Sequence, residues 1–200
     1  MSEPRLQAIR PAPLPPQGDA ALIAVDRSLG ELRRGRGIAV RDAKGWRLVV
    51  PLETADAALI DYILRQPGAE LVVTGARAAA LKVPCEADEV LLLTLPPGLA
   101  TDQVRELGHH WDADGWRSAL GGAVPLATCA DAVCLAAVQL AKSAQLLPAL
   151  LVAPLQTGAV PINVLAVDIA DVERHAQPRE DDLLRISEAR VPLREGEDSR

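Results

Sequence analysis

The first regular pattern of apolar residues in the chain is helical. Behind Asp19, apolar residues recur every three or four positions as far as Leu32, which predicts an amphipathic helix that begins near Ala20. Asp19 is a good N-cap residue, because its carboxylate can accept a hydrogen bond from the first free backbone N–H groups. Gly35 suits the left-handed residue that ends a helix. The pattern therefore predicts a helix from about residue 20 to the arginines before Gly35.

The rest of the chain alternates between strand-like and helix-like segments. Two short apolar runs, 37–41 and 45–51, flank the polar tip "DAKG" and predict a hairpin. Further helices are expected over 54–65, 76–83 and 130–146 and from residue 101 onward. Further strands are expected from the apolar runs at 69–75, 89–95, 150–154 and 162–169. A charged segment over 171–186 is also expected to be helical. Since no internal repeat is present, the pattern predicts an α/β fold, a layered sandwich around a mixed sheet.

The domain organisation follows from where this pattern begins and ends. Residues 1–19 are rich in proline and lack periodicity, so they are expected to form a flexible leader. Residues 20–186 are expected to form one α/β domain, and the polar residues 187–200 a linker. With three Trp, one Tyr and no Phe, the core of this domain must be filled by Leu, Val, Ile and Ala.

Charge and cysteine content exclude several classes of function. The net charge of −6 argues against a nucleic-acid-binding surface, which needs a positive field. Three cysteines without CxxC spacing argue against a zinc site or a disulfide framework and favour a reduced, cytoplasmic protein. The longest apolar runs are too short to span a bilayer, and no secretory signal precedes the domain, so no membrane partner is expected.

Two groups of residues could bind a ligand. Arg33, Arg34 and Arg36 could hold a phosphate through their guanidinium groups, although the end of a helix explains the same cluster. His109 and His110 stand beside two aspartates in the segment "GHHWDADGW", which could bind a metal or move a proton, or could be an exposed loop. No further metal ligand stands at a recognisable spacing, so no metal site is predicted.

The cysteines and the known sequence motifs give no catalytic residue. Cys129 and Cys134 are expected at the start of a helix, where a thiolate would be stabilised. Cys134 continues the apolar face of that helix, however, so it is expected to pack as a small hydrophobic residue. Phosphate-binding glycine loops and the common hydrolase motifs are absent from the sequence. The residues alone therefore name no active site.

Four stretches, taken in order, resemble proteins of riboflavin biosynthesis. They are "SLGELRRGRGIAV" (28–40), "ADAALIDYILRQPGAELVVTGARAAALKVP" (55–84), "GGAVPLATCADAVCLAAVQLAKSAQLLPALLVAPL" (121–155) and "LLRISEARVPLREGED" (183–198). The first three resemble 3,4-dihydroxy-2-butanone 4-phosphate synthase. The fourth resembles the junction that joins such a domain to GTP cyclohydrolase II. The resemblance implies the N-terminal, synthase-like domain of a GTP cyclohydrolase II protein of the alphaproteobacterial type.

The chain differs from the synthase family at the positions of that family's catalytic and metal-binding residues. The family has an acidic loop between its first two strands that supplies Mg²⁺ ligands and an arginine, and "RDAKGWR" (41–47) takes its place here. The family's G-H-T-E motif supplies a catalytic His and a metal-binding Glu, and these positions become Val133 and Leu135. Ala123 stands where another family His would align. An enediol mechanism needs a divalent metal and a base, and Val and Leu can serve as neither.

The resemblance and its departures predict a catalytically degenerate synthase-like domain that acts in structure or assembly. The chain by itself is expected to be inactive, without a cofactor, and to form a homodimer as the synthases do. A GTP cyclohydrolase II domain, joined in cis or bound in trans, is the expected partner, and zinc would belong to that domain. The alternative is a domain with a remodelled site that binds a phosphate or nucleotide ligand through Arg33, Arg34, Arg36, His109 and His110.

Overall fold

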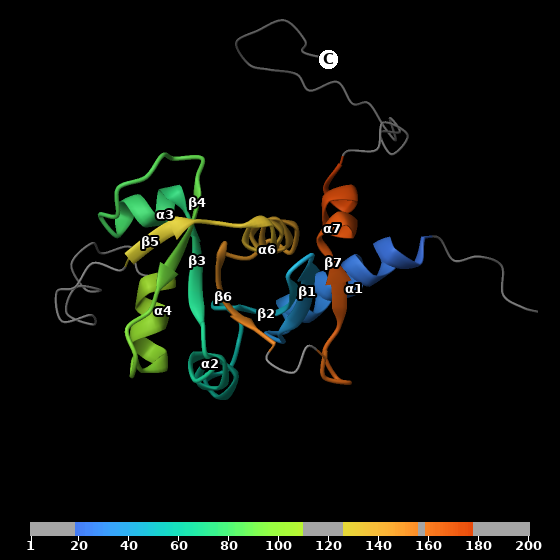
Figure 1. Ribbon diagram of the computed structural model, residues 1–200, viewed down its shortest axis with the longest axis horizontal. Helices are drawn as coiled ribbons and strands as arrows, with labels where there is room; N and C mark the ends of the chain where they lie inside the picture. Colours follow the sequence, from blue (N-terminus) through green and yellow to red (C-terminus); the bar gives the residue numbers. More distant parts are fainter. Residues whose placement is uncertain (1–18, 110–125, 156–158, 178–200) are drawn as a thin grey trace, which may run out of the picture.

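The computed structural model describes residues 19–109, 126–155 and 159–177. They form six- to fourteen-residue helices around one sheet (Figure 1). The helices are α1 (Ala20–Arg33), α2 (Ala57–Leu64), α3 (Gly75–Ala80), α4 (Thr101–His109), α6 (Ala132–Ser143) and α7 (Ile169–Ala176). The strands are β1 (Ile38–Asp42), β2 (Gly45–Pro51), β3 (Glu70–Thr74), β4 (Val90–Thr94), β5 (Leu126–Cys129), β6 (Ala149–Pro154) and β7 (Ala166–Asp168).

The sheet is mixed, as the sequence predicts. Its seven described strands follow the order β5-β4-β3-β6-β2-β1-β7. Every neighbouring pair is antiparallel except β1 and β7, which run parallel at one edge. β6 is paired on both sides, with β2 and with β3, so it joins the first hairpin to the rest of the sheet.

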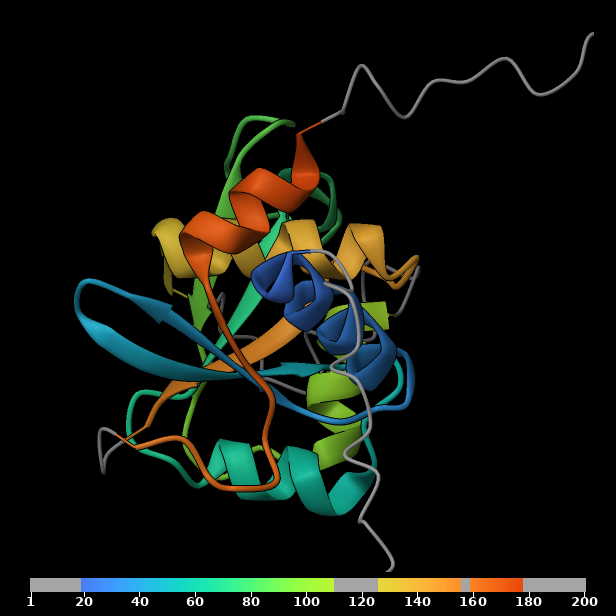
Figure 2. The same cartoon turned by 90° about the vertical axis from the view of Figure 1, so that its right-hand side faces the viewer.

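Helices cover both faces of the sheet. Figure 2 shows α1, α6 and α7 on one face and α2 and α4 on the other. Successive side chains of a strand point to opposite faces of the sheet. In β2, Val49 accordingly packs with the helices α1, α6 and α7, whereas Leu48 and Val50 pack on the face of α2 and α4. The two apolar clusters lie on opposite faces, so the fold is a three-layered α/β sandwich built almost without aromatic residues.

The expected start and end of the first helix are confirmed. Asp19 is the N-cap of α1, and its Oδ1 accepts the Ala21 backbone N–H at 2.9 Å. Gly35 has a φ of +76°, and a Cβ at this position would lie 2.2 Å from the carbonyl oxygen of Thr54. Only glycine allows α1 to end so close to the segment that follows β2. The predicted hairpin is also present as β1 and β2.

Several of the sequence-based boundaries need correction. Residues 126–129 form the edge strand β5, so Cys129 does not lie at the start of a helix. The helix expected from residue 130 begins at Ala132, since the Asp131 side chain caps it. The helix expected from residue 54 begins at Ala57, where the side chain of Asp56 accepts the Leu59 N–H.

The strand expected over 162–169 is limited to the three residues of β7. The carbonyl of Pro161 accepts the Val164 N–H at 2.9 Å, so a turn occupies the first half of this apolar run. Ile162 in that turn is fully exposed. The charged helix expected over 171–186 begins earlier, as α7, and the part beyond residue 177 lies outside the described residues. Within the described part of the chain, no helix has the length and apolar character needed to cross a membrane.

Candidate functional site

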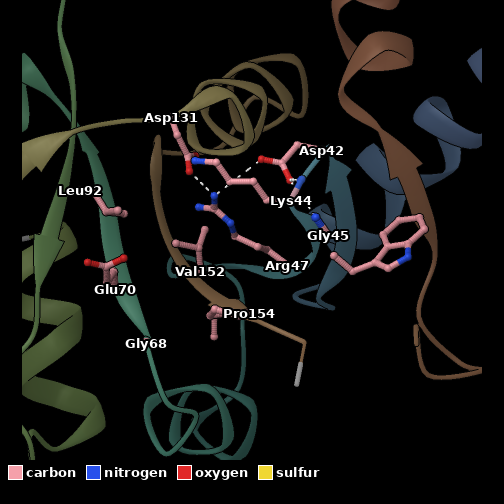
Figure 3. Close-up of a pocket in the computed structure, with 12 residues that line it drawn as sticks. Asp42, Lys44, Gly45, Arg47, Gly68, Glu70, Leu92, Asp131, Val152 and Pro154 are labelled. Atoms are coloured by element: carbon pink, nitrogen blue, oxygen red, sulfur yellow. Dashed lines mark hydrogen bonds and ion pairs between the residues drawn. The ribbon is translucent and has the colours of Figure 1, made fainter. Parts of the chain in front are cut away.

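A pocket of about 390 Å³ lies where the tip of the β1–β2 hairpin meets the first turn of α6 (Figure 3). Its charged lining residues are Asp42, Lys44, Arg47, Glu70 and Asp131. The hairpin supplies the first three of these, β3 supplies Glu70, and Asp131 stands directly before α6. Residues far apart in the sequence therefore come together at the short "DAKG" tip. We call this cavity the hairpin-tip pocket.

Arg47 is the central group of the hairpin-tip pocket. Its Nη2 forms an ion pair with Oδ2 of Asp131, lies 3.8 Å from Oδ2 of Asp42, and its Nη1 lies 3.7 Å from Sγ of Cys134. Only 16% of the Arg47 side chain is exposed. Burial alone would lower the pKa of Arg47, but the hydrogen bond and charge of Asp131 outweigh burial and raise it. Arg47 thus stays positively charged, and the carboxylates beside it neutralise that charge.

Asp131 has two structural roles in the same pocket. Besides pairing with Arg47, its Oδ1 accepts the Cys134 backbone N–H at 3.2 Å, which caps the start of α6. Burial alone would raise the pKa of Asp131, but the hydrogen bonds from Arg47 and from the Cys134 backbone hold it below its usual value. At neutral pH this carboxylate is ionised and bound on both sides, so it is not a poised general base.

The first turn of α6 presents apolar side chains at the two positions where the synthase resemblance places a His and a Glu. Val133 is completely buried in the core, and Leu135 is 51% exposed. The Cys134 thiol between them is buried too, and burial, with the nearby Asp131 charge, raises its pKa to about 12. A thiol with that pKa stays protonated at neutral pH, so Cys134 packs as the sequence predicts and is no nucleophile.

The arginines named from the sequence separate into two sets. Arg34 and Arg36 line a second pocket of about 510 Å³ at the opposite end of β1. Arg33 instead donates from Nε to the carbonyl of Ala144 at 3.0 Å and from Nη2 to the carbonyl of Ser143 at 3.2 Å. It therefore satisfies the carbonyl groups at the end of α6 and holds α1 against that helix.

The histidines named from the sequence are described only in part. His109 is the last residue of α4, and its side chain, like the whole of His110, lies outside the described residues. Among the residues that the structure describes, no group of three or more His, Cys, Asp and Glu side chains could hold a metal ion.

The cluster of Asp42, Arg47 and Asp131 was missed by sequence reasoning. Arg47 and Asp131 are 84 positions apart, and no motif links them. The one available signal was local, because an aspartate before an apolar helical run is a typical N-cap. That signal could have marked Asp131, but nothing in the sequence points from it to Arg47.

Comparison with known sequences relates the chain to one protein of riboflavin biosynthesis. No family model matches the sequence. A curated relative, GTP cyclohydrolase-2 of Azospirillum brasilense, is 35% identical over 194 residues, which cover 89% of this chain and 49% of that protein. The chain therefore spans about half the length of the curated relative that it matches.

Comparison with solved structures relates the fold to one group of enzymes. The 3,4-dihydroxy-2-butanone 4-phosphate synthase of Candida albicans superposes with a TM-score of 0.54 at 14% identity, over 77% of this chain and 97% of that one. A two-domain synthase from A. baumannii gives a TM-score of 0.52 at 14% identity, over 74% of this chain and 56% of that one. A synthase solved with two magnesium ions gives 0.51 at 14% identity, over 76% and 95%. The chain thus has the fold of the 3,4-dihydroxy-2-butanone 4-phosphate synthases and is similar in sequence to about half of a GTP cyclohydrolase-2.

Proposed function

We propose that this domain has lost the synthase reaction and serves the structure or assembly of a GTP cyclohydrolase II protein in riboflavin biosynthesis. The observation that carries the proposal is the first turn of α6, where Val133 is buried and Leu135 is exposed. The resemblance expects a catalytic His and a metal-binding Glu at these two positions. Neither Val nor Leu can transfer a proton or bind a metal.

The hairpin-tip pocket does not fit the divalent metal that the synthase family uses. Two of its carboxylates, Asp42 and Asp131, face the guanidinium of Arg47, so their charge is already matched. Magnesium prefers several oxygen ligands in near-octahedral order, several of them water. Glu70 is the remaining carboxylate of the lining, and Lys44 adds a second cation. A pocket with two cations and three carboxylates, two of them paired, is a poor site for Mg²⁺.

The partner in this proposal is a cyclohydrolase II domain, because the chain matches 49% of a GTP cyclohydrolase-2. The relative's name describes the whole protein, so the other half is the place for GTP chemistry and for zinc. The present domain would contribute a folded α/β unit, a homodimer contact, or both, in the cytoplasm where riboflavin synthesis takes place. The proposal thus assigns the chain a role in assembly and not in chemistry.

An activity assay tests the loss of the synthase reaction. The purified chain is incubated with ribulose 5-phosphate and Mg²⁺, and the dihydroxybutanone phosphate product is measured by chromatography beside an active synthase as positive control. We expect no product above the protein-free background. Sustained turnover that scales with protein concentration would contradict the proposed loss of the synthase reaction.

A deletion experiment tests the assembly role separately. A full-length GTP cyclohydrolase II protein that contains this domain is compared with a version that lacks it, by analytical ultracentrifugation, thermal unfolding and GTP hydrolysis. We expect the shortened protein to change its oligomeric state and to unfold at a lower temperature. Unchanged assembly and unchanged thermal stability would count against the proposal, whatever the synthase assay shows.

A further inference from the structure

A second pocket, at the end of the β1–β2 hairpin opposite its tip, combines two exposed arginines with an apolar wall. Its volume of about 510 Å³ is larger than that of the hairpin-tip pocket, and the two share no lining residue. Its lining includes Arg34 and Arg36 together with the apolar or aromatic residues Leu48, Leu59 and Tyr62. We propose that this pocket, which we call the arginine pocket, binds a phosphate ester joined to a planar ring.

The two arginines have more positive charge than their protein partner neutralises. Both pair with one carboxylate, that of Glu31: Nη1 of Arg36 lies 2.8 Å and Nη1 of Arg34 lies 3.7 Å from it. Each arginine side chain is 64% exposed, whereas Glu31 is 20% exposed. Nη1 of Arg34 also donates to the carbonyl of Gly30 at 3.0 Å. Each guanidinium has about five N–H donors, so these partners in the described part of the chain leave donors of both arginines available to a ligand.

The carboxylate of Asp56, a third charged residue of the lining, formally balances the remaining positive charge but is itself engaged in the fold. Asp56 is the N-cap of α2, and its Oδ1 accepts the Leu59 N–H at 2.8 Å. The positive end of the α2 helix dipole therefore offsets part of its negative charge. The guanidinium groups of Arg34 and Arg36 remain the more exposed charges, so they can still donate to an anion.

The geometry favours a phosphate over a carboxylate as the anionic group. Arg34 and Arg36 flank Gly35, whose left-handed backbone ends α1 and turns the chain into β1. Two guanidinium groups from neighbouring positions can each donate paired hydrogen bonds, and a phosphate ester has three terminal oxygens to accept them. A single carboxylate has only two oxygens, and Glu31 already supplies one carboxylate here.

The apolar wall favours a ligand with a planar ring beyond the phosphate. Tyr62 is 48% exposed although it is a large aromatic residue, and it lines the pocket together with Leu48 and Leu59. An exposed tyrosine face can stack on a flat ring at little cost in conformational entropy. The volume lies within the range of about 300–1,000 Å³ that is typical of small-molecule pockets. The inference goes beyond the proposed assembly role and does not depend on it.

Isothermal titration of the intact chain tests the inference with three probes. GMP and FMN carry the same phosphate ester on different planar rings, and inorganic phosphate lacks a ring. Variant Arg36→Gln removes one guanidinium from the pocket. Variant Arg27→Gln is the matched control, because Arg27 is exposed on the same chain segment, in α1, and does not line the pocket. Thermal unfolding of each variant checks that the fold is retained.

We expect GMP or FMN to bind at least about tenfold more tightly than phosphate, and the comparison of the two shows which ring fits. Arg36→Gln should weaken the better nucleotide about tenfold or more, and Arg27→Gln should leave it within about twofold. Tyr62→Leu, which keeps the apolar volume, should weaken the nucleotide about threefold or more and leave phosphate unchanged. Absence of binding by all three probes, equal affinity for phosphate and both nucleotides, or unaltered affinity in Arg36→Gln would overturn the inference.

Discussion

Arg47 of β2 and Asp131 at the start of α6 form an ion pair that joins the sheet to the helix across the hairpin-tip pocket. The side chains are only 16% and 30% exposed, so water screens the pair less than it would screen a surface pair. Asp131 also caps α6 through the Cys134 N–H. Substitutions of Asp131 can therefore separate the ion pair from the helix cap, because Asn keeps an oxygen that caps α6 but loses the negative charge.

We expect Asp131→Asn to lower the free energy of unfolding by about 1–2 kcal/mol, because Asp42, which is more distant, is then the carboxylate that remains near Arg47 among the described residues. Asp131→Ala should lose about 1 kcal/mol more, since Ala cannot cap a helix. Urea unfolding followed by circular dichroism measures both values. Asp88→Asn is the control, because Asp88 is exposed in a loop and should give a change within about 0.5 kcal/mol. Equal stability of wild type and Asp131→Asn would contradict the role assigned to the pair.

The contribution of Asp131 to stability should depend on pH in one direction only. Its pKa in the folded protein lies below the unfolded value of about 3.9, so the folded state binds its proton more weakly than the unfolded state does. The stabilisation is complete above the unfolded pKa and is lost as the pH falls through the folded pKa. The difference between wild type and Asp131→Asn should therefore stay constant from about pH 5 to 7 and shrink below about pH 4. A difference that grew at low pH would contradict this assignment.

Arg33 should behave as a structural residue although it belongs to the cluster first considered for phosphate. Its guanidinium donates to two carbonyl groups at the end of α6, those of Ser143 and Ala144. We expect Arg33→Ala to cost about 1–2 kcal/mol of unfolding free energy, since these carbonyl groups lose charged donors. Arg27→Ala, also in α1, should cost less than about 0.5 kcal/mol. Urea unfolding distinguishes the two, and a neutral Arg33→Ala would contradict the helix-end role.

Local signals in the sequence predicted most of the fold, because helix caps and hairpins depend on neighbouring residues. Asp19, Gly35 and the hairpin tip act within a few positions of themselves, and all three are where the pattern placed them. The edge strand β5 was missed because its four residues stand directly before a strong helix. The apolar pattern places Ile162 in a strand, and this prediction is wrong because Ile162 is an apolar residue that remains exposed in a turn.

The candidate pockets could be predicted far less well than the fold, since each depends on contacts between distant segments. Arg33, Arg34 and Arg36 look alike in the sequence, yet Arg33 turns to α6 while the other two line the arginine pocket. The reason is that Arg33 is the last residue of α1, whereas Arg34 caps the helix and Arg36 follows the left-handed Gly35, so the three side chains leave the backbone in different directions. Which neighbour lies in each direction is set by tertiary packing, and the sequence does not state it.

Among the described glycines with positive φ, Gly35 should be the least replaceable. A Cβ on Gly35 would lie 2.2 Å from the Thr54 carbonyl oxygen, in addition to the strain of its left-handed backbone. Gly98 has a similar φ of +84°, but a Cβ there would meet no atom within 4 Å. We expect Gly98→Ala to cost about 1 kcal/mol and Gly35→Ala at least about 3 kcal/mol. Thermal and urea unfolding measure the difference, and equal costs would contradict the close approach of α1 to Thr54.

The three cysteines should differ sharply in their reaction with thiol reagents. Cys129 is exposed on the edge strand β5, whereas Cys134 is fully buried in α6. Burial and the charge of Asp131 raise the pKa of the Cys134 thiol to about 12, so little thiolate is present in mildly alkaline buffer. Cys85 is half-buried, and its Sγ lies 3.3 Å from the carbonyl oxygen of Gly75, so an intermediate rate is expected.

Labelling with iodoacetamide followed by peptide mass spectrometry measures these rates. Cys129 should react at least about a hundredfold faster than Cys134 in the folded protein, because Cys129 is exposed whereas Cys134 is buried and its raised pKa keeps its thiolate scarce. In concentrated guanidinium chloride the difference should disappear, since unfolding exposes both thiols. The Asp131→Asn variant supplies a second comparison, because loss of the negative charge beside the thiol should speed the labelling of Cys134. Rapid modification of Cys134 in the folded wild type would show that the first turn of α6 is open, and would contradict its packing against the sheet.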